Sequence, residues 1–124
     1  MNLLIFGRDI LVQRIKTILQ ESGVNVITAS LEMLSRFTAP DAWDLAIIDM
    51  GFENAEEACQ IIKKNRNLPL VLIVKHRQAD WSYLDSLNAS GYIFDNFNKN
   101  ELIARLSAIF RRYHIDASEL MQAN

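Results

Sequence analysis

The chain has 124 residues, of which 50% are hydrophobic and 23% charged, which suits one soluble domain with its own core and leaves little room for a second. Its 13 basic and 15 acidic residues are interspersed and give a net charge of −2, so we expect this domain to bind neither nucleic acid nor an anionic membrane surface. A single cysteine, Cys59, excludes an intramolecular disulfide and a cysteine-rich zinc site. The apolar run 3–6 is too short for a signal peptide or a membrane span, so a cytoplasmic location is predicted.

Short apolar runs alternate along the chain with amphipathic stretches of helical period, a pattern typical of β–α–β units on a parallel sheet. The runs are rich in Leu, Ile and Val and lack polar alternation, which predicts strands buried on both faces. Five strands are predicted, at residues 2–6, 24–28, 44–48, 70–74 and 91–95.

Helices are predicted between and after these strands. The first and the last have clear apolar stripes with helical spacing. These stripes are Leu11, Ile15, Ile18 and Leu19, ended by Gly23, and Leu102, Leu106, Ile109 and Phe110. Weaker helical patterns cover residues 31–38, 54–65 and 79–87. We expect residues 1–114 to form the domain and the polar residues 115–124 to be a tail or the start of a linker.

A carboxylate, Asp49, directly follows the third predicted strand and precedes a turn at Gly51. In an open parallel sheet the carboxyl ends of the strands form the crevice where ligands bind, so Asp49 is the leading candidate for a functional residue. The loop 6–10 after the first strand has one glycine and no Ser or Thr, so it lacks the cradle that an FMN or nucleotide phosphate needs. An enzyme or a flavin-binding protein is therefore disfavoured, and we expect no cofactor.

Several segments resemble the receiver domain of bacterial response regulators. Residues 43–49 are similar to that family's third strand and phosphoacceptor, and residues 68–74 to the segment leading into its fourth strand. Residues 89–94 and 101–112 are similar to the ending of receivers in the OmpR/PhoB branch of transcription factors. The resemblance covers nearly the whole chain. It implies a flavodoxin-like (βα)5 fold, a doubly wound α/β domain whose five parallel strands have the order 2-1-3-4-5.

The metal site of that family is altered in this sequence. Receivers hold Mg²⁺ with two acidic residues after the first strand, and the matching positions here fall among Phe6, Gly7 and Arg8. Asp9, one residue beyond, is the remaining carboxylate, while Arg8 brings a fixed positive charge. Mg²⁺ binding is therefore not expected.

The phosphate-binding positions also differ. Val74 matches the hydroxyl residue at the end of that family's fourth strand, and Asp95 matches the lysine at the end of the fifth. Two carboxylates about 5 Å apart repel by roughly 3 kcal/mol at an effective dielectric constant of about 20, which opposes phosphorylation of Asp49. We expect backbone amides to hold Asp49 and Arg8 to form a salt bridge with Asp49 or Asp95.

These departures favour a phosphorylation-independent, receiver-like regulatory domain, the N-terminal module of a transcriptional regulator that acts through protein–protein contacts. The alternative is a working phosphoreceiver, phosphorylated on Asp49 by a histidine kinase. The OmpR/PhoB resemblance implies a homodimer through the fourth helix, fifth strand and fifth helix, formed here without phosphate. Candidate interface residues are Asp80, Asp85, Glu101, Arg105, Arg111 and Arg112.

Overall fold

The computed structural model describes residues 1–36, 43–64, 68–75, 77, 79–113 and 115–116. Within these ranges strands and helices alternate along the chain. In order they are β1 (Asn2–Phe6), α1 (Asp9–Gln20), β2 (Asn25–Thr28), α2 (Leu31–Ser35), β3 (Leu45–Asp49), α3 (Ala55–Lys63), β4 (Leu70–Val74), α4 (Trp81–Ser86), β5 (Gly91–Phe94) and α5 (Lys99–Arg112).

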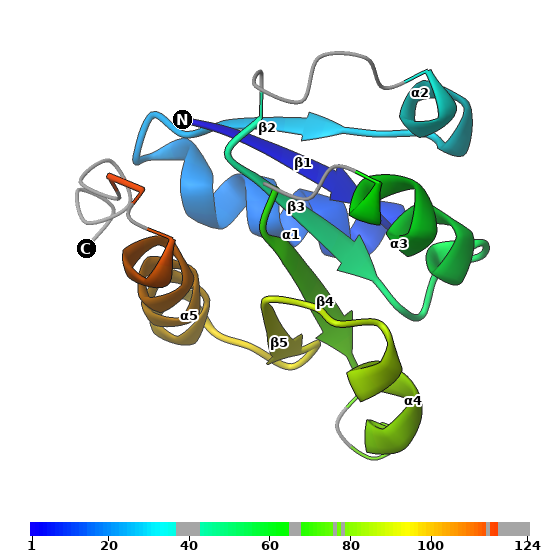
Figure 1. The fold of residues 1–124 in the computed structure, drawn as a ribbon. Coiled ribbons are helices and arrows are strands. Elements are labelled where there is room, and N and C mark those ends of the chain that lie inside the picture. Colours follow the sequence, from blue (N-terminus) through cyan, green and yellow to red (C-terminus); the bar gives the residue numbers. More distant parts are fainter. Residues whose placement is uncertain (37–42, 65–67, 76, 78, 114, 117–124) are drawn as a thin grey trace.

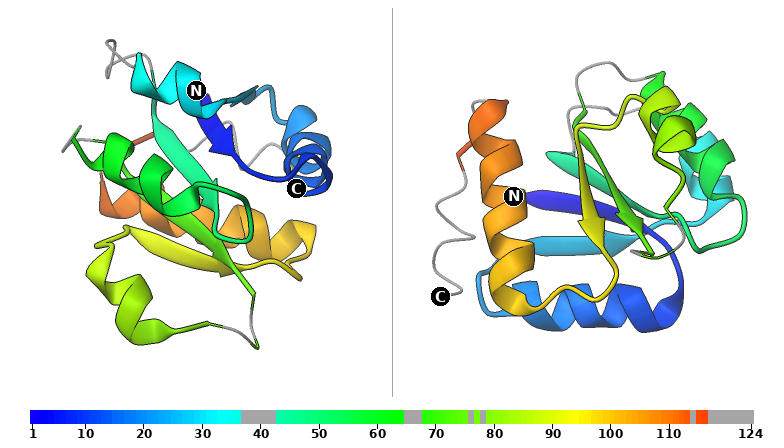
Figure 2. Two further views of the ribbon diagram at one scale, coloured as in Figure 1. Left: turned by 90° about the vertical axis from the view of Figure 1, so that its right-hand side faces the viewer. Right: turned by 90° about the horizontal axis from the view of Figure 1, so that it is seen from below.

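The strands form one parallel sheet in the order β2-β1-β3-β4-β5. Helices α1 and α5 cover one face of this sheet, and α2, α3 and α4 cover the other (Figures 1 and 2). The predicted fold, a doubly wound five-stranded α/β domain of the flavodoxin-like type, is confirmed.

Alternate residues of the strands feed two separate cores, because successive side chains of a strand point to opposite faces. In β3, Leu45 and Ile47 pack with α1 and α5, whereas Ala46 and Ile48 pack with α2, α3 and α4. The same division holds in β4, where Val71 and Ile73 join the first core. A side chain at the end of a strand is therefore directed to one helical layer by its position in this alternation.

The predicted bounds of the first and fourth strands are confirmed, and those of the other three differ by one residue. The three weaker helices are shorter than predicted, and the predicted ends at Thr38 and Asn65 lie outside the described residues, as do residues 114 and 117–124. Burial on both faces is correct for β3 and β4 but wrong for β2 and β5, which are mostly partly buried or exposed. These two strands form the sheet edges, where the helical layers cover less of each face.

Helix α5, which packs against the sheet beside β5, begins with a well-formed cap. The side chain of Asn98 accepts a hydrogen bond from the backbone N–H of Glu101 at 2.8 Å. This contact satisfies one of the N–H groups that have no partner within the helix, and the acidic Glu101 side chain suits the positive end of the helix dipole.

Replacing this cap should weaken the whole domain. We expect Asn98→Ala to lower the free energy of unfolding by about 1 kcal/mol, because the N–H of Glu101 loses its acceptor. Urea titration followed by circular dichroism measures the change. Asn98→Asp is the matched control, since aspartate caps equally well, and a loss of similar size in both variants would contradict the capping explanation.

Candidate functional site

Asp49 and Arg8 meet because of the register of β1 and β3. Phe6 pairs with Ile48, which sets Gly7 beside Asp49 at the carboxyl edge of the sheet. Asp49 follows Leu45 and Ile47 in the alternation, so its side chain lies on the α1 side. Arg8 is the N-cap of α1 and therefore projects from the same edge.

The Asp49 carboxylate accepts four hydrogen bonds. Its Oδ2 accepts from Nε of Arg8 at 2.7 Å and from the Arg8 backbone N–H at 3.1 Å. Its Oδ1 accepts from Nη2 of Arg8 at 3.2 Å and from the backbone N–H of Gly51 at 2.9 Å. The expected backbone amides and the expected Arg8 salt bridge are both confirmed. Since a carboxylate has about four lone-pair positions, this arrangement fills them all.

Burial makes these contacts strong. The Asp49 side chain is 1% exposed and that of Arg8 33% exposed, so the pair is shielded from much of the screening that water gives a surface salt bridge. The hydrogen bond to Asp49 raises the pKa of Arg8, with burial acting in the opposite direction and the charges of Asp49 and Asp95 adding to the rise. Arg8 is thus a permanent cation at this edge of the sheet.

Two glycines make room for the ion pair. A Cβ atom at Gly7 would lie 2.6 Å from Cβ of Asp49, and one at Gly51 would lie 3.1 Å from Cζ of Arg8. Both glycines therefore allow a close approach that a side chain would obstruct. The role of Gly51 could have been inferred from its place two residues after Asp49.

Asp95 also lies near the Arg8 guanidinium. The Oδ2 atom of Asp95 is 3.9 Å from Nη2 of Arg8, and the Asp95 side chain is 29% exposed. This contact is therefore longer and more exposed to solvent than the contact between Arg8 and Asp49. The turn after β5 is also held by Arg14, which donates to the carbonyl oxygens of Asp95 and Phe97 at 2.8 Å each and lies over the Phe97 ring. The sequence reading missed Arg14, because nothing in the sequence separates it from a solvated arginine on α1.

The other altered positions do not join this cluster. Val74 belongs to the opposite core, with α2, α3 and α4, and Asp9 is exposed in the first turn of α1. Among the described residues, no three His, Cys, Asp or Glu side chains are grouped to hold a metal ion. Both oxygens of Asp49 are engaged and a guanidinium lies against them, so the residues at this edge do not fit Mg²⁺.

Cys59 is fully buried in α3, with its sulfur 3.9 Å from that of Met50. Burial raises the pKa of this thiol to about 11, so it is protonated near neutral pH and is a packed residue rather than a nucleophile.

An aromatic cluster lies where α4 packs against β5. Trp81 of α4 is 46% exposed and makes edge contacts with the rings of Tyr92 and Phe94 in β5, at centroid distances of 5.6 and 6.1 Å. The Tyr92 hydroxyl donates to the carbonyl of Leu84, which ties β5 to α4. The sequence could not show whether Trp81 belongs to the core or to the surface. In the structure one part of its ring system packs on β5 and another part is exposed to solvent.

Charged candidates lie on α4 and α5, which cover opposite faces of the sheet. Asp80 caps α4 by accepting from the N–H of Tyr83. Burial raises the pKa of Tyr92, and the negative charge of Asp85 and its hydrogen bond add to the rise. On α5, Arg112 donates to the carbonyl of Ser90, the residue directly before β5.

The remaining candidates are all exposed on α5. At about 100° per residue, Glu101 and Arg105 fall on the same side of the helix as Arg112, whereas Arg111 falls roughly 100° away from it. Of the four candidates on α5, Arg111 is therefore the one turned furthest from Arg112.

Fold and site together define a receiver-type α/β domain whose strand-end carboxylate is engaged by an arginine. No family model matches the chain. It is 30% identical over 107 residues to the transcriptional regulatory protein CpxR of Escherichia coli, covering 81% of this chain and 44% of CpxR. It is 24% identical over 112 residues to the heme response regulator HssR of Staphylococcus haemolyticus, covering 88% of this chain and 46% of HssR. The chain thus spans less than half the length of either relative.

Solved structures agree on the fold. The non-phosphorylated receiver domain of HemR from Leptospira biflexa superposes with a TM-score of 0.72 at 22% identity, over 87% of this chain and 92% of that domain. The chain therefore has the receiver fold, and its sequence relatives are response regulators. No helix in the described part of the chain is both long and apolar enough to cross a membrane.

The ion pair yields a prediction about stability. We expect Arg8→Ala to lower the free energy of unfolding by roughly 2–4 kcal/mol, because it leaves the buried Asp49 carboxylate without its cation. Asp49→Asn should cost less, since the amide oxygen can still accept from a backbone N–H and no buried charge remains. Urea titration of both variants measures the difference. Equal losses, or a larger loss for Asp49→Asn, would count against the role of Arg8.

Proposed function

We propose that this domain is a phosphorylation-independent receiver whose Arg8 replaces the cation of a phosphorylation site. It acts through protein contacts rather than as an enzyme, and it needs no Mg²⁺. The observation that carries the proposal is the fourfold hydrogen bonding of Asp49, with two of the four donors on the Arg8 guanidinium.

Phosphoryl transfer to an aspartate requires a free carboxylate oxygen as nucleophile and positive charge around the incoming phosphoryl oxygens. Here each Asp49 oxygen already accepts two hydrogen bonds, and Asp95 brings negative charge within 3.9 Å of the same guanidinium. Attack by Asp49 would therefore have to break buried contacts and bring a dianionic group towards a second carboxylate. Both effects oppose phosphorylation by a histidine kinase.

Pairing with a second copy is the output that we propose. Trp81 offers an exposed aromatic anchor beside Tyr92 and Phe94, and tryptophan is among the side chains that contribute most at protein interfaces. Basic Arg105 and Arg112 on α5 and acidic Asp80 and Asp85 on α4 could pair across a twofold axis. Val74 carries no hydroxyl through which a phosphate could alter this face, so we propose that the dimer forms constitutively.

In the full-length protein we propose that the domain regulates transcription. CpxR, named as a transcriptional regulatory protein, matches this chain over 44% of its length, which leaves room there for an effector domain. The proposed role is the regulatory module of such a protein, and its proposed partner is a histidine kinase or another regulatory protein.

Chemical phosphorylation tests the first part of this proposal. We expect the chain to keep its unmodified mass after incubation with acetyl phosphate and Mg²⁺, because both oxygens of Asp49 already accept hydrogen bonds and the described residues beside it form no metal site. Intact-mass spectrometry makes the measurement, with a receiver that accepts phosphate from acetyl phosphate as positive control. An added phosphoryl group that disappears in Asp49→Asn would establish the working phosphoreceiver instead.

Sedimentation tests the second part. At tens of micromolar and without phosphate we expect a dimer, and Arg105→Glu should weaken it about tenfold or more by placing like charges opposite each other. Arg36→Glu is the matched control, because Arg36 directly follows α2, away from α4 and α5, and its exposed salt bridge to Glu32 contributes little. A monomeric wild type, or equal effects of the two substitutions, would remove the support for this interface.

A further inference from the structure

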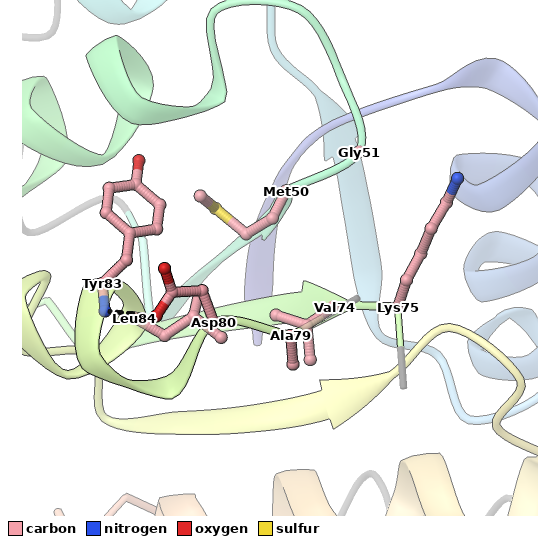
Figure 3. Close-up of a pocket in the computed structure, with 8 residues that line it drawn as sticks. All are labelled: Met50, Gly51, Val74, Lys75, Ala79, Asp80, Tyr83 and Leu84. Atoms are coloured by element: carbon pink, nitrogen blue, oxygen red, sulfur yellow. Dashed lines mark hydrogen bonds between the residues drawn. The ribbon is translucent and has the colours of Figure 1, made fainter. Parts of the chain in front are cut away.

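A pocket of about 360 Å³ opens beside the Asp49 crevice, between the turn after β3 and helix α4 (Figure 3). Its volume falls in the range of small-molecule sites. The apolar part of its wall consists of Met50, Val74, Ala79 and Leu84, with the ring of Tyr83 at one side. Val74 stands where the resemblance places a hydroxyl residue, so the pocket gains apolar surface at that point.

One charged group points into this space. Figure 3 shows the Asp80 carboxylate directed into the pocket beside Met50, while Lys75 extends away along the opposite edge. One oxygen of Asp80 accepts from the backbone N–H of Tyr83 and caps α4. Its other oxygen accepts no hydrogen bond from the residues that the structure describes. An unfilled carboxylate oxygen is therefore available next to an aromatic ring and a thioether.

These groups select the charge of a ligand. A carboxylate attracts an ammonium group through a charge-assisted hydrogen bond, and the face of a tyrosine ring also favours a cation. Methionine adapts its shape to varied apolar groups, so Met50 can pack against the rest of the molecule. Anions would meet the Asp80 charge, and neutral molecules would lose the charged contact.

We propose that this pocket binds small organic cations, each a protonated amine attached to an apolar or aromatic body. The amine donates to the free oxygen of Asp80, and the body packs between Met50, Tyr83 and Leu84. No bond is made or broken in this binding.

The pocket is connected to both parts of the proposed function. Gly51, which also lines it, donates to Asp49, and Asp80 begins the helix that carries Trp81. Any effect of a bound amine on pairing rests on the proposed function, whereas binding itself does not. A measurement of binding alone therefore separates failure of the pocket from failure of the dimer.

Titration of the ¹⁵N-labelled chain followed by NMR tests the pocket. The probes are 2-phenylethylamine, 2-phenylethanol and 3-phenylpropanoate, which share an aromatic body and differ in charge, each added to about 10 mM. We expect the amine to shift the amide signals of Met50, Gly51 and Tyr83. Its affinity should exceed that of the alcohol about tenfold, and the propanoate should bind more weakly still.

Two variants locate the charge that matters. Asp80→Asn keeps the helix cap but removes the charge, so it should reduce the affinity for the amine to that for the alcohol. Glu53→Gln removes an exposed charge close in sequence to the turn after β3 but outside the pocket wall, and it should leave the affinity unchanged. The proposal is overturned by absence of amine binding, by equal or stronger binding of the propanoate, or by shifts confined to another part of the domain. Equal effects of the two substitutions would overturn it as well.

Discussion

The carboxyl edge of the sheet, where the parallel strands end, depends on one requirement: the charge of the almost completely buried Asp49 carboxylate must be neutralised. Removing a charged group from water costs several kcal/mol unless another charge and hydrogen-bond donors replace the water. For Asp49 these are the Arg8 guanidinium and two backbone amides. A guanidinium at this position needs space and negative charge around it. Gly7 and Gly51 provide the space, and Asp95 provides a second negative charge.

Much of this arrangement could be predicted because it follows from the order of the chain. Apolar runs of Leu, Ile and Val locate the strands, and parallel strands bring their carboxyl ends to one edge, which is why Arg8 and Asp49 were expected to meet. The sequence could not show the Arg14 contacts or the pocket beside α4, because these depend on how loops and short helices settle against the sheet. Both edge strands contain apolar residues that are typical of buried strands, Val26 and Ile27 in β2 and Ile93 and Phe94 in β5, so the exposure of these strands was also missed.

Burial divides the charges of this domain into two groups that respond differently to salt. Screening acts over about 8 Å at physiological ionic strength and affects exposed charges far more than shielded ones. The pair formed by Arg8 and the buried Asp49 should keep its strength when ions are added. Salt bridges made by the exposed arginines of α5 should weaken when ions are added. Ionic strength can therefore alter contacts between molecules while leaving the crevice of each molecule intact.

The close packing at Gly7 bears on how such a domain could change during evolution. A side chain at this position would bring its Cβ within 2.6 Å of Cβ of Asp49, an atom fixed close to the backbone of β3. An acid introduced at position 7 alone would thus have to separate β1 from β3 before it could hold a metal ion. A single substitution at Gly7 therefore passes through a less stable protein, so an acidic side chain is difficult to introduce at this position without compensating changes elsewhere.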